Sequence, residues 1–184
     1  MQKKNIFLSI ILIFSISIAI LIFWKFTADT EPTNDVEEQS LRFDAIDFSL
    51  KSPYDESIIT LEDFKGKTLV VNFFATWCFS CQIEIPHFVD TMQIYQNTDV
   101  FFLGVNIQED KDSVQKFAKE MGINYPIGID STGETIFKYG VRILPTTIFI
   151  NKEGVVVYVY EGPLTKEQLI SLVEYTNQLS KELA

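Results

Sequence analysis

The sequence predicts an α/β protein in which helices cover a mixed sheet, and three observations support this fold class. Two nearly continuous apolar runs, 68–74 and 99–107, have the length and composition of strands that are buried on both faces. Segments with helical spacing of apolar residues alternate with strand-like runs. Near the end, two β-rich runs at 145–150 and 155–162 flank the turn NKEG and predict a closing hairpin.

The composition indicates a packed domain with few candidate metal ligands. Of the 184 residues, 47% are hydrophobic and 14% aromatic, which argues against a disordered chain. The net charge is −10 and the pI is about 4.5, so we expect no attraction for phosphate backbones and no nucleic-acid partner. A single histidine excludes a histidine-rich metal site, and neither a metal nor another cofactor is expected.

Residues 1–26 are expected to form a signal-anchor transmembrane helix. Between Lys4 and Lys25 lie twenty uncharged residues. As a helix they span roughly 30 Å, the thickness of the hydrocarbon core of a bilayer. Trp24 has the position of an interfacial anchor, lysines precede the run and an acidic stretch follows it. This asymmetry predicts a single-pass protein of the cell membrane with a cytoplasmic N-terminus and an extracytoplasmic domain.

A cleaved signal peptide is the alternative interpretation of this segment. The apolar run is longer than a usual h-region of about 7–15 residues, and no convincing A-x-A cleavage site follows it. A core helix of the domain is a poorer interpretation, because the run is apolar all round. We expect the polar, acidic residues 27–41 to form a flexible tether and residues 42–184 to form the folded domain.

The first half of the domain contains a predicted hairpin, a strand and a helix. Short apolar-alternating runs at 43–50 and 56–61 suggest the hairpin, and FKGK suggests a turn before the strand at 68–74. The segment 79–95 fits a helix, because its apolar residues share one face. Pro86 within it predicts a kink.

The second half alternates strands and helices around the closing hairpin. After the strand at 99–107 we expect a helix at 109–122, a short strand at 125–130 and a short helix at 131–140, and a last helix covers 165–183. Capping boxes mark helix starts and glycines mark helix ends. The expected boxes are Asp112-x-x-Gln115, Ser131-x-x-Glu134 and Thr165-x-x-Gln168, and the expected end signals are Gly122 and Gly140.

Cys78 and Cys81 are the only cysteines in the chain, and four kinds of site compete to explain them. A zinc site needs four ligands, whereas the chain holds two cysteines and one histidine. A copper-carrying thiol pair usually uses a histidine well downstream, but His87 follows Cys81 closely. A purely structural disulfide would close a loop of only a few residues, which restrains the unfolded chain little.

The fourth interpretation is a redox-active pair, and its place in the predicted fold favours it. The thiols follow the strand at 68–74 and open the next helix, whose N-terminus carries partial positive charge and stabilises a thiolate. Cys78, at the helix entrance, is the predicted nucleophile, and Cys81, one turn deeper, is the predicted resolving thiol. Export would place the pair in a compartment where disulfide exchange has substrates.

The stretch VVNFFATWCFSC resembles the active-site strand and turn of the thioredoxin-like fold. Over roughly residues 42–182, and in its anchor, the chain resembles the membrane-anchored TlpA/ResA family of extracytoplasmic thiol–disulfide oxidoreductases, within the AhpC/TSA-redoxin superfamily. DFSL…LEDFKGK resembles the family's N-terminal hairpin, and 109–141 resembles its central strand–helix insertion. RILPTTIFINKEG resembles its cis-proline loop and last hairpin, and Pro86 stands where the fold has a kinking proline.

The resemblance implies roles for residues near the cysteines. Pro145 would be a cis-proline packed against the Cys78–Cys81 disulfide, and Leu144 would offer backbone groups to an extended substrate segment. Trp77 would wall the site, with core packing as the alternative. Glu84 would be a partly buried carboxylate that tunes the thiols, as in the ResA branch, with a solvated helix charge as the alternative.

The implied activity is reduction of disulfides in exported proteins. Phe79-Ser80 departs from the family's common Glu-Pro, and no histidine lies between the cysteines, where strongly oxidising relatives tend to carry one. An ionised Glu84 would raise a thiol pKa, which also favours a reductant. Because Asn72 stands where thioredoxin has a buried acid, Glu84 is the candidate for proton transfer with Cys81.

The resemblance also implies partners. Apocytochrome c, in cytochrome c biogenesis, is the best-known substrate of ResA-type proteins, and other exported proteins fit the sequence equally. Electrons would come from a membrane thiol carrier of the CcdA or DsbD type. The alternatives are a thiol oxidant, a peroxiredoxin-like peroxidase and a redox-silent anchored binding module. The peroxidase is disfavoured because the P-x-x-x-[TS]-x-x-C setting is missing before Cys78.

Overall fold

The computed structural model describes residues 42–182, which form the expected α/β domain. The predicted anchor at 1–26 and the tether at 27–41 lie outside the described residues. Between residues 42 and 182, no helix has both the length and the apolar character needed to cross a bilayer.

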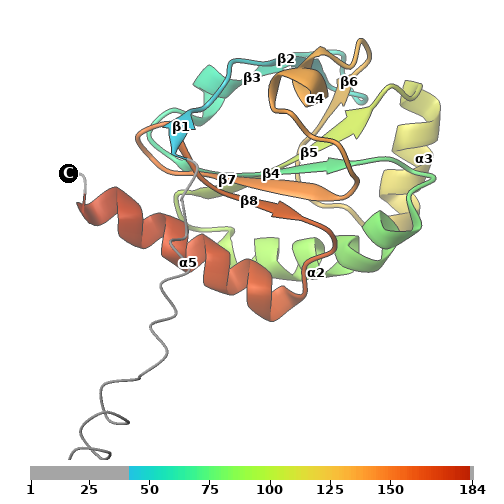
Figure 1. Ribbon diagram of the computed structural model, residues 1–184. Helices are drawn as coiled ribbons and strands as arrows, with labels where there is room; N and C mark the ends of the chain where they lie inside the picture. Colours follow the sequence, from blue (N-terminus) through green and yellow to red (C-terminus); the bar gives the residue numbers. More distant parts are fainter. Residues whose placement is uncertain (1–41, 183–184) are drawn as a thin grey trace, which may run out of the picture. The chain divides into compact units, whose positions relative to one another are not determined.

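One eight-stranded mixed sheet forms the centre of the domain (Figure 1). Its strand order is β1-β8-β7-β4-β5-β6-β2-β3. Strands β4, β5 and β6 run parallel, whereas β7 is antiparallel to β4 and β8. The bounds are Phe43–Asp44 for β1, Ser49–Lys51 for β2, Ile58–Thr60 for β3, Thr68–Phe74 for β4, Val100–Ile107 for β5, Ile127–Asp130 for β6, Thr146–Ile150 for β7 and Val155–Glu161 for β8.

Strand β4 is the central strand, and its burial explains why its sequence is nearly all apolar. All seven of its residues are buried, because β5 and β7 pair along its two edges and other elements cover both faces. Leu69, Val71 and Phe73 join the core on one face, and Val70 and Phe74 join the core on the other. The cysteine motif therefore follows directly after a fully buried strand.

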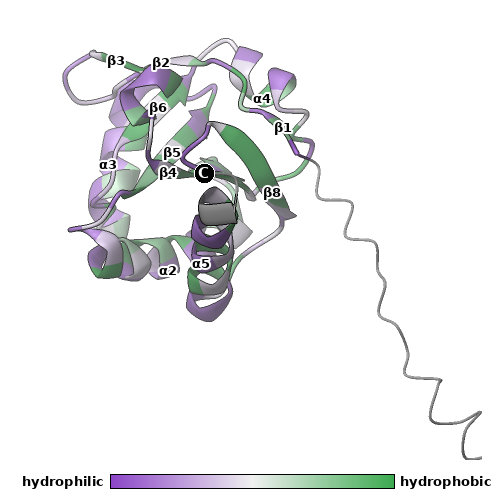
Figure 2. Cartoon of the chain, turned by 90° about the vertical axis from the view of Figure 1, so that its left-hand side faces the viewer, coloured by the Kyte–Doolittle hydropathy of each residue, from purple (hydrophilic) through white to green (hydrophobic). Residues whose placement is uncertain are grey.

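Helices cover both faces of the sheet (Figure 1). Helices α2, α3 and α5 pack on the face of Val70 and Phe74, with α2 beside α5, and η1 and α4 pack on the opposite face. Figure 2 shows hydrophilic colouring along the outside of α5 and hydrophobic colouring in strands such as β8. The bounds are Leu61–Phe64 for η1, Phe79–Tyr95 for α2, Lys111–Met121 for α3, Glu134–Lys138 for α4 and Lys166–Glu182 for α5.

The predicted strand at 43–50 is instead two short strands that lie far apart in the sheet, with β1 at one end and β2 second from the other end. Phe43 pairs with Val156 of β8, whereas Leu50 pairs with Ile59 of β3. The expected N-terminal hairpin is therefore formed by β2 and β3 alone. Apolar alternation looks the same in both pieces, so the sequence pattern does not show that their pairing partners differ.

Two of the three predicted capping boxes are wrong. Asp110, rather than Asp112, caps α3, and its carboxylate accepts a hydrogen bond from the backbone N–H three residues later at 2.9 Å. Helix α4 begins after Gly133, which has a φ of 75° and makes no side-chain cap bond. The box of Thr165 and Gln168 is confirmed, with reciprocal hydrogen bonds of 2.9 and 3.3 Å.

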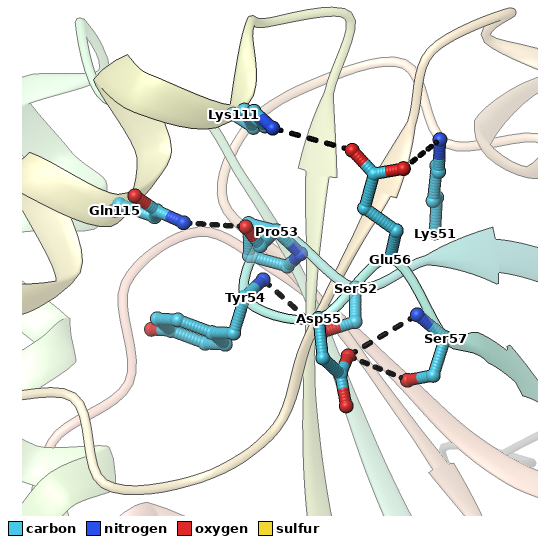
Figure 3. Close-up of polar contacts among 9 residues, drawn as sticks. All are labelled: Lys51, Ser52, Pro53, Tyr54, Asp55, Glu56, Ser57, Lys111 and Gln115. Carbon is cyan, nitrogen blue, oxygen red and sulfur yellow. Dashed lines mark hydrogen bonds and ion pairs between the residues drawn. The ribbon is translucent and has the colours of Figure 1, made fainter.

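The turn between β2 and β3 is tied to the beginning of α3 by side chains (Figure 3). Glu56 pairs with Lys51 at 3.1 Å and with Lys111 at 3.2 Å, and Gln115 donates a hydrogen bond to the carbonyl of Pro53. These ion pairs are half exposed, so solvent screens them and each adds little to the stability of the fold. Their effect is to hold the edge hairpin against α3.

Candidate active site

Cys78 lies where the chain leaves β4 and enters α2. Its Sγ accepts a hydrogen bond from the backbone N–H of Cys81 at 3.2 Å and so caps the helix. The two cysteines form a disulfide, with their Cα atoms 5.3 Å apart. Cys78 is 6% exposed and Cys81 is 0% exposed, in the predicted order. Cys78 is therefore the sulfur that another molecule can reach.

The peptide bond between Leu144 and Pro145 is cis, as the resemblance implies. Pro145 is buried, and the half-buried Leu144 packs against the apolar cluster that contains both cysteines. The carbonyl oxygen of Leu144 accepts a hydrogen bond from the hydroxyl of Ser80 at 3.5 Å. The loop before β7 therefore meets the first turn of α2 at the disulfide.

A surface hollow of about 570 Å³ opens beside Cys78. Its lining comes from four parts of the chain: the turn at residues 75–80 (the active-site turn), β5, α4 and the loop at residues 141–145 before β7 (the cis-proline loop). Trp77 and Phe79 line it and are 72% and 74% exposed. Core packing, the alternative role for Trp77, is therefore wrong, and the side chain lies at the wall of the hollow.

Glu84 is fully buried on α2, one turn after Cys81. One carboxylate oxygen accepts a hydrogen bond from the side-chain amide of Asn72 at 2.6 Å, and the other accepts one from the backbone N–H of Leu164 at 3.0 Å. Burial raises the pKa of Glu84 to about 7, although both hydrogen bonds act in the opposite direction. The solvated-charge alternative is therefore wrong, and this carboxyl changes protonation near neutral pH.

Asn72, on β4, can form a hydrogen bond with Glu84 in both protonation states of the carboxyl group. Its Nδ2 donates to Glu84 and, at 3.1 Å, to the hydroxyl of Thr147. Its Oδ1 has no partner within the described residues. With the amide turned over, Oδ1 would accept a hydrogen bond from a protonated Glu84 and from the Thr147 hydroxyl. A second acid at this position would instead repel the ionised carboxylate.

Glu109 holds the active-site turn, a role that the sequence analysis did not find. In the loop after β5, its carboxylate accepts hydrogen bonds from the backbone N–H and the hydroxyl of Thr76 and from the side-chain amide of Asn106. From the other side, the amide of Gln82 donates to the carbonyl of Thr76 at 2.8 Å. Thr76 precedes Cys78 by two residues, so these bonds fix the approach to the nucleophile. In the sequence Glu109 is one of three acids after a buried strand, with Asp110 and Asp112, so the pattern does not single it out.

The described part of the chain offers no metal-ligand set at the cysteines. Both sulfurs belong to the disulfide. Across residues 42–182, the structure groups no three His, Cys, Asp or Glu side chains in a way that suits a metal ion.

Two sulfurs three residues apart at the start of a helix can open and close a disulfide with little backbone movement, which is what thiol–disulfide exchange requires. The domain is thus a thiol–disulfide oxidoreductase of the thioredoxin-like class. Sequence comparison identifies its family. The chain belongs to the AhpC/TSA family, whose sequence profile matches residues 42–159.

Curated relatives carry the name thiol-disulfide oxidoreductase ResA. The protein from Geobacillus thermodenitrificans is 41% identical, and the alignment covers 59% of this chain and 63% of that protein. The protein from Halalkalibacterium halodurans is 33% identical over 95% of this chain and 97% of its own length. Among solved structures, a thiol:disulfide interchange protein from Chlorobium tepidum has 32% identity and a TM-score of 0.66, covering 72% of this chain and 94% of that one. StoA from Bacillus subtilis has 27% identity and a TM-score of 0.61, covering 72% and 97%.

Proposed function

We propose that the protein reduces disulfide bonds in exported proteins, with Cys78 and Cys81 acting as a dithiol. The observation that carries this proposal is the position of the disulfide, at the helix entrance and next to an open hollow. An extended segment could pair with the backbone of Leu144 while its sulfur approaches Cys78. Trp77 would then contact the segment from the side.

The proposed reaction transfers two electrons from the dithiol to the substrate disulfide. The Cys78 thiolate attacks one substrate sulfur, the substrate S–S bond breaks, and a mixed disulfide and one substrate thiolate result. Cys81 then gives its proton to the Glu84 carboxylate and attacks the sulfur of Cys78. The Cys78–Cys81 disulfide forms, the second substrate thiolate leaves, and both substrate thiolates take up the protons that the protein thiols have lost.

Glu84 also bears on the direction of this reaction. An ionised carboxylate close to the thiols disfavours a thiolate and so makes the dithiol less stable relative to the disulfide, which favours a reductant. We expect the reduced protein to convert a peptide disulfide to its dithiol near pH 7, and the oxidised protein to oxidise the peptide dithiol much less. Quantifying free thiols in both directions tests this expectation. Preferential oxidation of the peptide would establish the oxidant alternative.

We also propose that the domain acts outside the cytoplasm, anchored by residues 1–26. The long apolar run and the charge asymmetry around it support this placement. Apocytochrome c and other exported proteins would then be accessible substrates, and a membrane thiol carrier of the CcdA or DsbD type would supply the electrons. The protein should fractionate with membranes, and protease added to intact protoplasts should remove the domain. A domain that survives this treatment in intact protoplasts would contradict the topology.

A further inference from the structure

One cation stands in the otherwise uncharged hollow beside Cys78. Apolar side chains from the active-site turn, β5, α4 and the cis-proline loop form its walls. Arg142 is the only charged side chain in the lining that the structure describes, and no carboxylate lines the hollow there. The whole chain has a net charge of −10. The hollow therefore differs from the acidic chain around it, because it presents a cation to a visiting group.

Arg142 is available to a partner from another molecule. It is exposed, and none of the ion pairs formed among residues 42–182 includes it. By contrast, Lys138 on the nearby helix α4 pairs with Glu134 at 2.6 Å. A guanidinium has the planar, two-pronged geometry that suits a carboxylate. A substrate carboxylate could therefore bind Arg142 without displacing an acidic partner within these residues.

Trp77 and Phe79 provide the apolar part of the same surface. They flank Cys78 in the sequence, and both remain more than two-thirds exposed, at 72% and 74%. Large aromatic surfaces exposed next to each other are unfavourable in water and typically mark a binding surface. Covering them with an apolar side chain would bring the visiting segment over the sulfur of Cys78.

We propose that the hollow selects extended segments in which the reacting cysteine lies close to a large apolar residue and to an aspartate or glutamate. The apolar residue would cover Trp77 and Phe79, and the carboxylate would pair with Arg142. This inference rests on the proposed reduction of substrate disulfides and adds which disulfides react fastest. Because exposed ion pairs are weak, the preference for an acidic over a neutral residue should be about two- to fivefold.

A different role for Arg142 would also affect the rate of reduction. A cation near Cys78 stabilises a thiolate, and this effect would accelerate the reaction with every substrate equally. Pairing with a substrate carboxylate instead makes the effect of Arg142 depend on the charge of the substrate. The two roles are separated by changing Arg142 and the substrate charge in combination, as in a double-mutant cycle.

The experiment uses the full-length protein in detergent and three peptide disulfides that differ at one position. The position next to an invariant Leu-Cys pair is Glu, Gln or Lys, and single-turnover rates of reduction are measured for each peptide. For the wild type we expect the rate of reduction to decrease from the Glu to the Gln to the Lys peptide, by about two- to fivefold at each step. Arg142→Gln should bring the three rates together, whereas the matched charge removal Lys138→Gln should keep the order. Higher salt should narrow the wild-type differences, because it screens exposed charges.

Each contrary outcome identifies which statement fails. Equal rates for the three peptides with the wild type would overturn the acidic preference and leave disulfide reduction standing. If Arg142→Gln lowers the rate equally for all three peptides, Arg142 acts by stabilising the Cys78 thiolate. This outcome would also overturn the acidic preference. Loss of the preference in Lys138→Gln would show that the overall charge of the domain, rather than Arg142, is responsible. Failure to reduce any of the peptides would overturn the proposed function itself.

Discussion

Replacing Cys81 with serine is expected to stop the protein after its first chemical step. Cys78 can still attack a substrate disulfide, but no second thiol lies one helical turn away to displace the substrate, so a mixed disulfide accumulates. In Cys78→Ser, by contrast, reduction should fall to the uncatalysed rate. The remaining sulfur is that of Cys81, which has no exposed surface.

Both variants can be assayed with a peptide disulfide, by non-reducing electrophoresis and mass spectrometry of the adduct. The wild type is the control for release of the peptide, and Cys78→Ser is the matched control that should trap none. A stable adduct on Cys81 in Cys78→Ser would reverse the two roles. Faster alkylation of Cys81 than of Cys78 in the reduced wild type would lead to the same conclusion.

The central elements could be predicted from the sequence because local pattern and burial agree there. The sequence predicts 68–74 and 79–95 with the bounds that the structure has for β4 and α2. A strand covered on both faces is apolar at most positions, and the two polar side chains of β4, Thr68 and Asn72, form hydrogen bonds inside the domain. A helix that packs on one face repeats apolar residues at helical spacing. The disulfide follows from the same segment, since both cysteines lie within one turn of each other.

Features that depend on distant parts of the chain could not be predicted in this way. The strand at 43–50 divides because Phe43 finds its partner in β8, far along the sequence. Asp110 and Asp112 both fit the start of α3, and only the backbone of the loop decides between them. Glu109 and Arg142 come from separate loops that the fold brings to the active-site turn and the hollow. No periodicity links such residues.

The pH dependence of stability should change when Glu84 is replaced by glutamine. An unfolded glutamate loses its proton at about 4.5, whereas the buried Glu84 keeps it to about 7. The protonated Glu84 carboxyl therefore makes its full contribution to stability below about pH 4.5. This contribution is lost as the pH rises to about 7. With each pKa unit equal to about 1.4 kcal/mol, this loss amounts to about 3 kcal/mol in the free energy of unfolding.

Glutamine at this position removes the ionisation and can keep the hydrogen bonds. Its Oε1 can accept from the N–H of Leu164, and its amide can donate to Oδ1 of a turned-over Asn72. Glu84→Gln should therefore be more stable than the wild type above pH 7, by up to about 3 kcal/mol, and the two should converge near pH 4.5. Chemical denaturation of both proteins across this pH range measures the difference. Parallel curves would contradict a raised pKa for Glu84.

The same variant should lose activity while it gains stability, because the proton acceptor for Cys81 is removed. General acid–base catalysis typically contributes about 10²–10⁴-fold, so we expect formation of the Cys78–Cys81 disulfide from the mixed disulfide to slow by at least about a hundredfold near pH 7. Removing the negative charge should also lower the pKa of the thiols, which a titration of thiolate absorbance detects. Glu120→Gln, on the exposed surface of α3, is the matched control and should change neither quantity. A stable but slower Glu84→Gln distinguishes proton transfer from a structural role, since a merely structural carboxylate would lose stability and rate together.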